Sequence, residues 1–204
     1  MSQTPLCRVR PSTAIIALIA VFFATPAFAH LNPEEHGSFM AGFSHPLFGL
    51  DHILAMVAVG LWAALLGGRS VWLVPAAFVG TMMAGFAVAL AGLGLPFVEP
   101  VIAASVVVIG LLALVALQVP TIAGMAMVGV FAFFHGYAHG GELGEAGAMP
   151  FCVGFSMATA LLHAAGITLG IGMGRVAGGP TGRWITRAAG GLTALGGLWI
   201  VAGG

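Results

Sequence analysis

The stretch VWLVPAAFVGTMMAGFAVALAGL, residues 71–93, decides the fold class of this chain. It carries no charged side chain, and it is longer than the about 20 apolar residues that an α-helix needs to cross a membrane. Comparable apolar stretches recur along the chain, separated by short segments that contain glycine, proline or charged residues. The sequence therefore predicts an all-α, polytopic membrane protein.

The overall composition supports the same class. Hydrophobic residues make up 60% of the 204 residues, charged residues make up 6%, and the mean hydropathy is +1.10. A soluble domain carries roughly 25% charged residues, so this chain has too few charges to cover itself with a water-facing surface. The net charge is zero and lysine is absent, which leaves no basic patch for nucleic acid. The expected surroundings are a lipid bilayer.

Six apolar stretches follow residue 45. The predicted spans are 46–66, 71–93, 101–118, 121–141, 151–173 and 184–202. Because the connections between them are short, we expect a compact bundle of six transmembrane helices over residues 46–204, with consecutive helices antiparallel. Gly166, Gly170 and Gly174 recur at four-residue spacing, which predicts a face of the fifth helix that packs closely on a neighbour.

The first 29 residues are typical of a secretory signal peptide. Arg8 and Arg10 precede a short apolar run, and the small-x-small sequence Ala27-Phe28-Ala29 follows it. Cleavage after Ala29 would leave residues 30–45 as an N-terminal tail outside the cytoplasm. The alternative is an uncleaved first transmembrane helix.

The arginines predict the orientation of the bundle. Arg69 lies in the first loop, and the fifth loop is surrounded by Arg175, Arg183 and Arg187. In the second and fourth loops, all charged side chains are acidic. Because cytoplasmic loops are enriched in arginine and lysine, the odd-numbered loops are expected in the cytoplasm. Both ends of the mature chain are then expected in the periplasm, which agrees with a cleaved signal peptide.

Ionisable side chains gather near the outer ends of two predicted spans. The first span begins with His45, Asp51 and His52, and the fourth ends with His135, His139 and Glu142. At about 100° per residue, His45 and His52 share one face of their helix, and the three residues of the fourth span share one face of theirs. At about 1.5 Å rise, His52 and His135 lie at similar depth. Ionisable groups within a bilayer are costly and usually face a cavity. Two histidine-rich faces are therefore expected to meet.

This set of side chains predicts a site for a divalent transition-metal ion. Imidazole suits zinc, copper, iron and nickel, whereas magnesium and calcium prefer more oxygen ligands. Asp51 is either a direct ligand or an acceptor that fixes the tautomer of a histidine ligand. His163, in the middle of the fifth span, is either a metal ligand or an interhelical hydrogen-bond partner. His30 and His36, in the tail, either capture metal or are solvated.

Two motifs in this chain resemble those of a known family. They are HPLFGLDH, residues 45–52, and FHGYAHGGE, residues 134–142. With the signal peptide and six spans, they resemble the HupE/UreJ family, hydrogenase and urease accessory membrane proteins regarded as secondary nickel permeases. The resemblance covers nearly the whole mature chain. It implies metal passage through His45, Asp51, His52, His135, His139 and Glu142, while His163 is added from its depth and helix position.

We therefore expect a bacterial inner-membrane permease that takes up Ni²⁺, or alternatively Co²⁺, for hydrogenase or urease maturation. The metal ion is the transported substrate, and no permanently bound cofactor and no enzymatic activity are expected. A rival class is an intramembrane metal-dependent hydrolase, because His135 and His139 have the spacing of HExxH, although Gly136 replaces its glutamate. Another is a haem protein with axial histidines. A homo-oligomer is compatible with the sequence.

Overall fold

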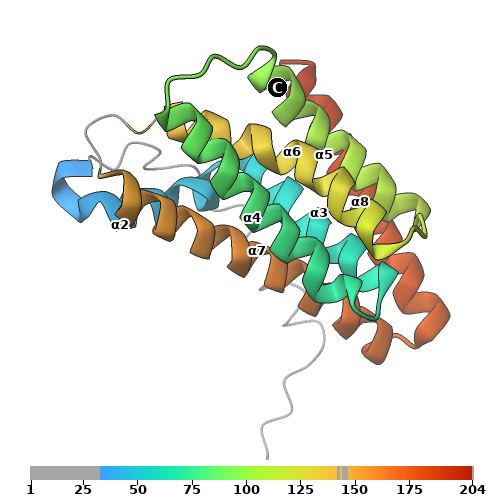
Figure 1. Cartoon of the computed structure of the whole chain (residues 1–204). Helices are drawn as coiled ribbons and strands as arrows, with labels where there is room; N and C mark the ends of the chain where they lie inside the picture. Colours follow the sequence, from blue (N-terminus) through green and yellow to red (C-terminus); the bar gives the residue numbers. More distant parts are fainter. Residues whose placement is uncertain (1–32, 142, 144–146, 204) are drawn as a thin grey trace, which may run out of the picture. The chain divides into compact units, whose positions relative to one another are not determined.

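Seven α-helices make up the part of the chain that the computed structural model describes, namely residues 33–141, 143 and 147–203, with side chains from residue 38 onward. The helices are α2 (Pro33–Phe48), α3 (Leu50–Leu66), α4 (Ser70–Leu90), α5 (Val98–Val115), α6 (Thr121–Gly141), α7 (Ala148–Val176) and α8 (Gly179–Val201) (Figure 1). The predicted all-α class is confirmed. The predicted signal peptide, residues 1–29, lies outside the described residues.

The last five predicted spans overlap α4 to α8, one helix each, whereas the first, 46–66, covers the end of α2 and all of α3. Four of these helices, α4 to α7, are long and apolar enough to cross a membrane. A fifth candidate is the pair α2 and α3, which is bent by 79° at the break between them. The long helix α8 is less apolar, because Arg183 and Arg187 lie within it. The described residues thus contain four or five candidate spans, and the number six stays a prediction.

The region before the first predicted span is largely helical. Within the predicted tail, residues 30–45, the helix α2 begins at Pro33. This helix packs along α7, and the rings of Phe39 and Phe43 stack with their centroids 6.1 Å apart. The backbone N–H of Gly147 donates to Ser38 Oγ over 2.7 Å. The sequence does not predict α2, because the segment begins with polar residues and its apolar residues form only a short face.

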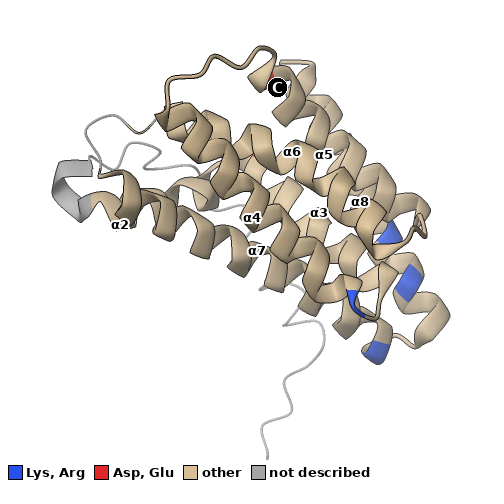
Figure 2. Ribbon diagram, in the orientation of Figure 1, with Lys and Arg blue, Asp and Glu red and all other residues tan. Residues whose placement is uncertain are grey.

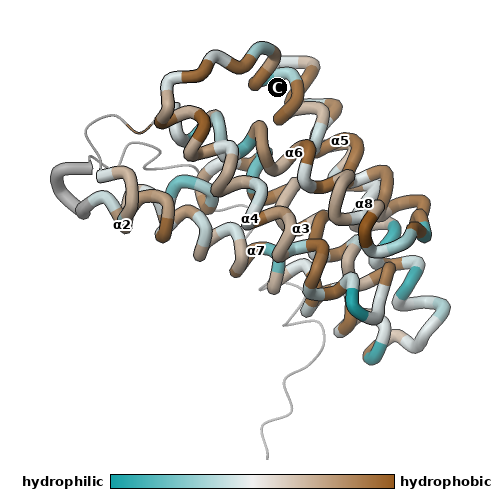
Figure 3. Tube along the Cα trace, in the orientation of Figure 1, coloured by the Kyte–Doolittle hydropathy of each residue, from teal (hydrophilic) through white to brown (hydrophobic). Residues whose placement is uncertain are grey.

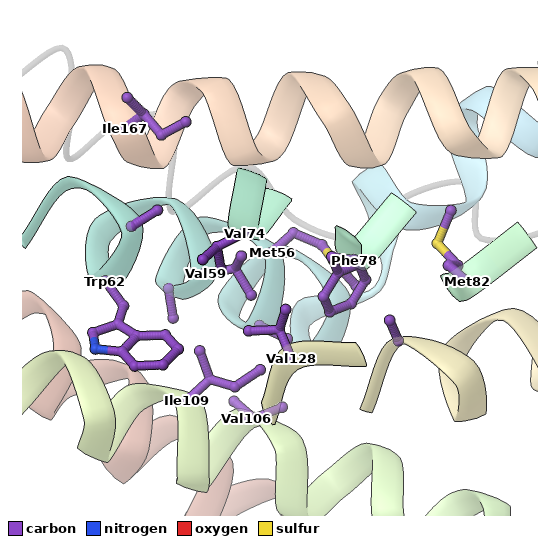
Figure 4. Packing of buried hydrophobic residues seen from close by; sticks show 14 of the residues in the cluster. Met56, Val59, Trp62, Val74, Phe78, Met82, Val106, Ile109, Val128 and Ile167 are labelled. Carbon is purple, nitrogen blue, oxygen red and sulfur yellow. The ribbon is translucent and has the colours of Figure 1, made fainter. Parts of the chain in front are cut away.

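Helix α3 lies at the centre of the packing. It contacts α2, α4, α5, α7 and α8, while α4 pairs with α6 and α5 pairs with α8. Trp62 of α3 is fully buried, and its indole N–H donates to the Leu117 carbonyl over 3.0 Å. Figure 4 shows how the core surrounds this helix; its labelled residues are Met56, Val59, Trp62, Val74, Phe78, Met82, Val106, Ile109, Val128 and Ile167.

Glycines let the helices that carry histidines approach their neighbours closely. A Cβ atom at Gly136 of α6 would lie 2.6 Å from the Met82 carbonyl carbon of α4, and one at Gly140 would lie 2.7 Å from the Phe86 carbonyl oxygen. Between α3 and α7, a Cβ at Gly60 would lie 2.8 Å from Gly166 Cα. Small residues at helix interfaces permit such backbone contact. These interfaces set the position of α6 against α4 and of α3 against α7.

The glycine face predicted on the fifth span is present in part. Gly166 faces the backbone of α3, and a Cβ at Gly170 would lie 2.7 Å from Ala64 Cβ of the same helix. A Cβ at Gly174 would meet no side chain or neighbouring backbone, although Gly174 itself lies against Gly182 of α8. The close contact with α3 thus ends after Gly170.

Charge and polarity are unevenly distributed along the bundle. The arginines among the described residues gather at the end where α3 joins α4 and α7 joins α8 (Figure 2). Apolar residues dominate the middle of the helices, and hydrophilic ones are concentrated toward the ends (Figure 3). His52, early in α3, and His139, late in α6, lie toward the opposite end from these arginines. The arrangement therefore separates a basic end from a histidine-bearing end.

Candidate metal centre

The break between α2 and α3 positions the first part of the site. His52 lies in the first turn of α3, and its Nδ1 atom is 2.9 Å from Asp51 Oδ1. A Cβ atom at Gly49 would lie 2.9 Å from both of these atoms, so a larger residue there would displace the side chains of Asp51 and His52. Because an ionised carboxylate can only accept, Asp51 accepts from the Nδ1–H of His52. The Nε2 atom of His52 is then the nitrogen with the lone pair.

Helix α6 supplies two more imidazoles, one turn apart. His135 and His139 are each followed by a glycine, Gly136 and Gly140, and those glycines lie against α4. A rotation of about 100° separates consecutive residues, so each histidine is turned away from this glycine contact. The side chains of His52, His135 and His139 approach one another, with ring centroids 4.7 Å apart for His52 and His139 and 5.1 Å for His52 and His135.

The three imidazoles form a buried cluster. One ligand atom from each of His52, His135 and His139 can be chosen so that all three lie within 4.8 Å of one another. The relative exposures of these residues are 7%, 0% and 1%. The Nε2 atoms of His52 and His139 are 2.7 Å apart. This group is called the histidine cluster below.

The rim of the site differs from the prediction in its construction. We predict that His45 and His52 share one face of a single helix, but the bend at Gly49 puts His45 in α2 and His52 in α3. The bend nevertheless leaves the rings of His45 and His52 close, with centroids 6.0 Å apart. The ring centroids of His45 and His139 are 4.5 Å apart. His45 is exposed, so it marks the accessible edge of the histidine cluster.

His163 of α7 lies beside the histidine cluster without joining it. Its Nδ1 atom is 2.8 Å from the Met56 carbonyl oxygen, to which it donates, and its Nε2 atom is buried without a partner among the described residues. The ring of Phe78 contacts both His163 and His135, with centroid distances of 4.9 and 5.9 Å. An aromatic ring thus lies next to both histidines.

Three predicted site residues have side chains outside the part of the chain that the structure describes. Glu142 and His30 lie outside the described residues, as does the side chain of His36. Other contacts were not predicted, namely Ser105 Oγ, 2.9 Å from His135 Nε2, and Phe155, whose ring lies 4.2 Å from that of His139. Serine and phenylalanine are common in apolar helices and follow no ligand spacing, so the sequence gives no signal for them.

The geometry of the histidine cluster suits a metal ion. Nitrogen ligands lie about 2.0–2.1 Å from zinc, so two ligands of one such ion are separated by about 3 Å. The two Nε2 atoms of His52 and His139 are already 2.7 Å apart. In the structure these two atoms share a hydrogen bond, in which the Nε2–H of His139 donates to the lone pair on Nε2 of His52. An ion replacing that proton would need the proton of His139 to move to Nδ1.

The chain is similar in sequence to known proteins. A sequence model of the family described as HupE / UreJ protein matches residues 17–200. Protein HupE of Rhizobium leguminosarum bv. viciae is 43% identical over 187 residues, which cover 91% of this chain and 95% of that protein. No solved structure is significantly similar to this chain.

Proposed function

The chain belongs to the HupE/UreJ family, and we propose that it is a permease that carries Ni²⁺ across the bacterial inner membrane for hydrogenase or urease maturation. The family consists of membrane accessory proteins and permeases and is not an enzyme family, so the intramembrane hydrolase alternative falls. The proposed cargo is nickel, with cobalt as the alternative, because both ions accept the same ligands.

One observation carries this proposal: the burial of three imidazoles whose ligand atoms converge within 4.8 Å. Ionisable side chains are expensive inside a membrane and usually mark the route of an ion or substrate. Neutral imidazole is also the commonest protein ligand for a late first-row metal ion. His52, His135 and His139 are the proposed ligands that replace part of the water shell of the ion.

The proposed route runs from the rim toward the middle of the bundle. The ion first meets the exposed His45, passes to the histidine cluster, and then reaches His163, beside which the Phe78 ring lies. In this proposal the histidine end faces the periplasm and the arginine end faces the cytoplasm, as the positive-inside rule predicts. A permease must bind well enough to select its ion and weakly enough to release it. Imidazole nitrogens meet that requirement better than thiolates.

Uptake of radioactive nickel tests the proposal. Cells that lack other nickel importers would produce the wild-type protein, His52→Ala or His135→Ala, with membrane abundance measured in each case. The matched control is Thr193→Ala, which removes a buried hydroxyl that donates to the Ala189 carbonyl of its own helix. We expect uptake to be lost in both histidine variants and kept in the control.

Two outcomes would contradict the proposal. Wild-type cells that take up no more nickel than cells without the protein would reject nickel transport, and the same assay with cobalt would show whether cobalt is the cargo. Unchanged nickel uptake in both histidine variants, at equal abundance, would place the route away from the histidine cluster.

A further inference from the structure

Helix α5 contributes one polar side chain to the site, Ser105. It is completely buried, and it belongs to neither of the two motifs that carry the histidines. Its Oγ atom lies 2.6 Å from the Ile102 carbonyl oxygen and 2.9 Å from His135 Nε2. A buried hydroxyl between a carbonyl and a proposed ligand is in a position to control the proton on that ligand.

The hydrogen bonds of Ser105 can be assigned by counting protons. A serine hydroxyl has one proton, and a carbonyl oxygen can only accept. The short bond to Ile102 therefore uses the proton of Ser105, as is usual for serine in a helix. The lone pair of Ser105 Oγ must then accept from Nε2–H of His135. In this tautomer the lone pair of the imidazole is on Nδ1.

The surroundings of His135 agree with this assignment. Its Nδ1 atom is buried and has no hydrogen-bond partner among the described residues. Buried polar atoms normally have a partner, so an exception calls for an explanation. The ring of His52 is 5.1 Å from that of His135, measured between centroids. A nitrogen lone pair left without a protein partner beside another imidazole is suited to bind a cation.

In His52 and His163, as in His135, one ring N–H donates to a fixed acceptor. Asp51 holds the Nδ1–H of His52, and the Met56 carbonyl holds the Nδ1–H of His163. Each ring therefore has one nitrogen whose proton is held and another with a lone pair. Histidine ligands usually donate their second N–H to a carboxylate or carbonyl, which fixes the tautomer and the ring orientation. Ser105 supplies the equivalent acceptor for His135.

We propose that Ser105 is a positioning residue that holds His135 as the Nε2–H tautomer, so that His135 binds the ion through Nδ1. His52, by contrast, binds through Nε2. The identity of the ion rests on the proposed function, whereas the tautomer does not. Loss of an acceptor that orients a metal ligand typically costs about 10- to 100-fold in affinity or activity.

The direct test is ¹⁵N NMR of metal-free protein labelled at histidine, in lipid. The signals of His135 are identified by their loss in His135→Asn. We expect a protonated Nε2 and an unprotonated Nδ1 in the wild-type protein, and a changed ratio of tautomers in Ser105→Ala. A wild-type His135 protonated at Nδ1, or a tautomer ratio that Ser105→Ala leaves unchanged, would overturn the proposal.

Nickel binding by calorimetry gives a second measure. Ser105→Ala should raise the dissociation constant by about 10- to 100-fold, and Ser105→Thr, which keeps the hydroxyl, should restore tighter binding. The matched control is Ser70→Ala, because Ser70 is also a buried serine but bonds to Thr121 Oγ1, at the start of α6. Equal affinity in Ser105→Ala and wild type would count against the inference.

The two proposals can fail separately. If wild-type protein neither binds nor transports nickel but the tautomer of His135 depends on Ser105, the proposed cargo is wrong and the role of Ser105 stands. If nickel is bound and transported while Ser105→Ala changes neither the tautomer nor the affinity, only the role of Ser105 is rejected.

Discussion

The Asp51–His52 pair shows how one residue prepares another for metal binding. The Nδ1 atom of His52 lies 2.9 Å from Asp51 Oδ1, and a hydrogen bond to a charged acceptor is stronger than one between neutral groups. Asp51 is half-buried, so water competes with the bond only in part. The sequence leaves Asp51 open between ligand and acceptor. The geometry favours the acceptor role, because the carboxylate is already in contact with Nδ1 of His52.

Replacing Asp51 by asparagine tests this role. Asp51→Asn keeps the size of the side chain but removes its charge, so His52 is held less firmly in the Nδ1–H tautomer. We expect the dissociation constant for nickel to rise about tenfold or more in calorimetry of detergent-solubilised protein. The matched control is Ser44→Ala, since Ser44 donates to the Ala41 carbonyl of its own helix. Unchanged affinity in Asp51→Asn would mean that the carboxylate does not prepare His52.

His163 allows binding and transport to be separated. In His163→Asn the amide can still donate to the Met56 carbonyl, but the unpartnered imidazole nitrogen is removed. We expect nickel affinity close to that of the wild type, because the histidine cluster is intact, and uptake lowered by at least about tenfold. That decrease corresponds to about 1.4 kcal/mol in the barrier of the rate-limiting step.

The control for His163 is Thr159→Val, a change at a buried residue one turn earlier in α7, where the hydroxyl donates to Met82 Sδ. Equal losses of affinity and uptake in His163→Asn would put His163 in the first binding site. Nickel uptake by His163→Asn equal to that of the wild type would mean that His163 is not on the route of the ion.

At the scale of single residues, the sequence predicts which histidines meet but not what holds them. His135 and His139 follow from spacing, because helical periodicity turns residues one turn apart to one side. His52 is predicted near them from its depth in the first span, although the single helix expected for His45 and His52 is broken at Gly49. Ser105 and the Met56 carbonyl cannot be found in this way. The first is an ordinary residue of an apolar helix, and the second is a backbone atom whose partner depends on how α7 packs on α3.

Among the helices, the interface of α4 and α6 holds the histidines in place. Gly136 follows His135 directly and lies against the backbone of Met82, where a Cβ atom does not fit. Overpacking of a tight contact costs typically about 1–3 kcal/mol. Since α6 cannot move from α4 without moving His135, this contact affects both stability and the site.

The substitution Gly136→Ala should therefore lower the unfolding temperature in detergent and reduce nickel uptake. The control is Gly80→Ala on α4, where a Cβ would meet no atom within 4 Å. Alanine there should be neutral or stabilising by up to about 1 kcal/mol, because alanine has a higher helix propensity than glycine. Thermal unfolding of both variants measures the difference. If Gly136→Ala were as stable and active as Gly80→Ala, the close contact would not be needed.

The helices themselves follow from the sequence better than their breaks do. Apolar length predicts α3 to α8 because each helix must satisfy its own backbone hydrogen bonds in lipid. The bend at Gly49 is different. Periodicity continues from His45 to His52 as if one helix held both, whereas α2 continues past Pro46 to Phe48 and α3 begins at Leu50.

For the molecule as a whole, composition predicts a helical membrane protein, but the pairing of helices depends on tertiary contacts. Glycine faces occur on several helices, so sequence spacing alone does not say that α4 pairs with α6 or α5 with α8. The same limitation applies to α8, which is long enough to span but not apolar enough to be a clear candidate. Its place in the membrane determines the side on which the chain ends.

The side of the C-terminus tests the proposed number of spans. Arg183 and Arg187 lie in the first half of α8, and Arg187 Nε donates to the Leu114 carbonyl over 2.7 Å, while the second half exposes Leu192, Leu195 and Leu198. Long arginine side chains can reach the membrane surface while their helix spans. At about 1.5 Å per residue, α8 is about 35 Å long, which exceeds the about 30 Å hydrocarbon core.

We therefore expect alkaline phosphatase fused after Gly204 to be active, and green fluorescent protein fused there to be dark. Both reporters fused after Ala177 provide the control, with the opposite result expected, because that loop lies between Arg175 and Arg183. An inactive phosphatase after Gly204, with the control as expected, would mean that α8 does not cross and that the bundle has five spans.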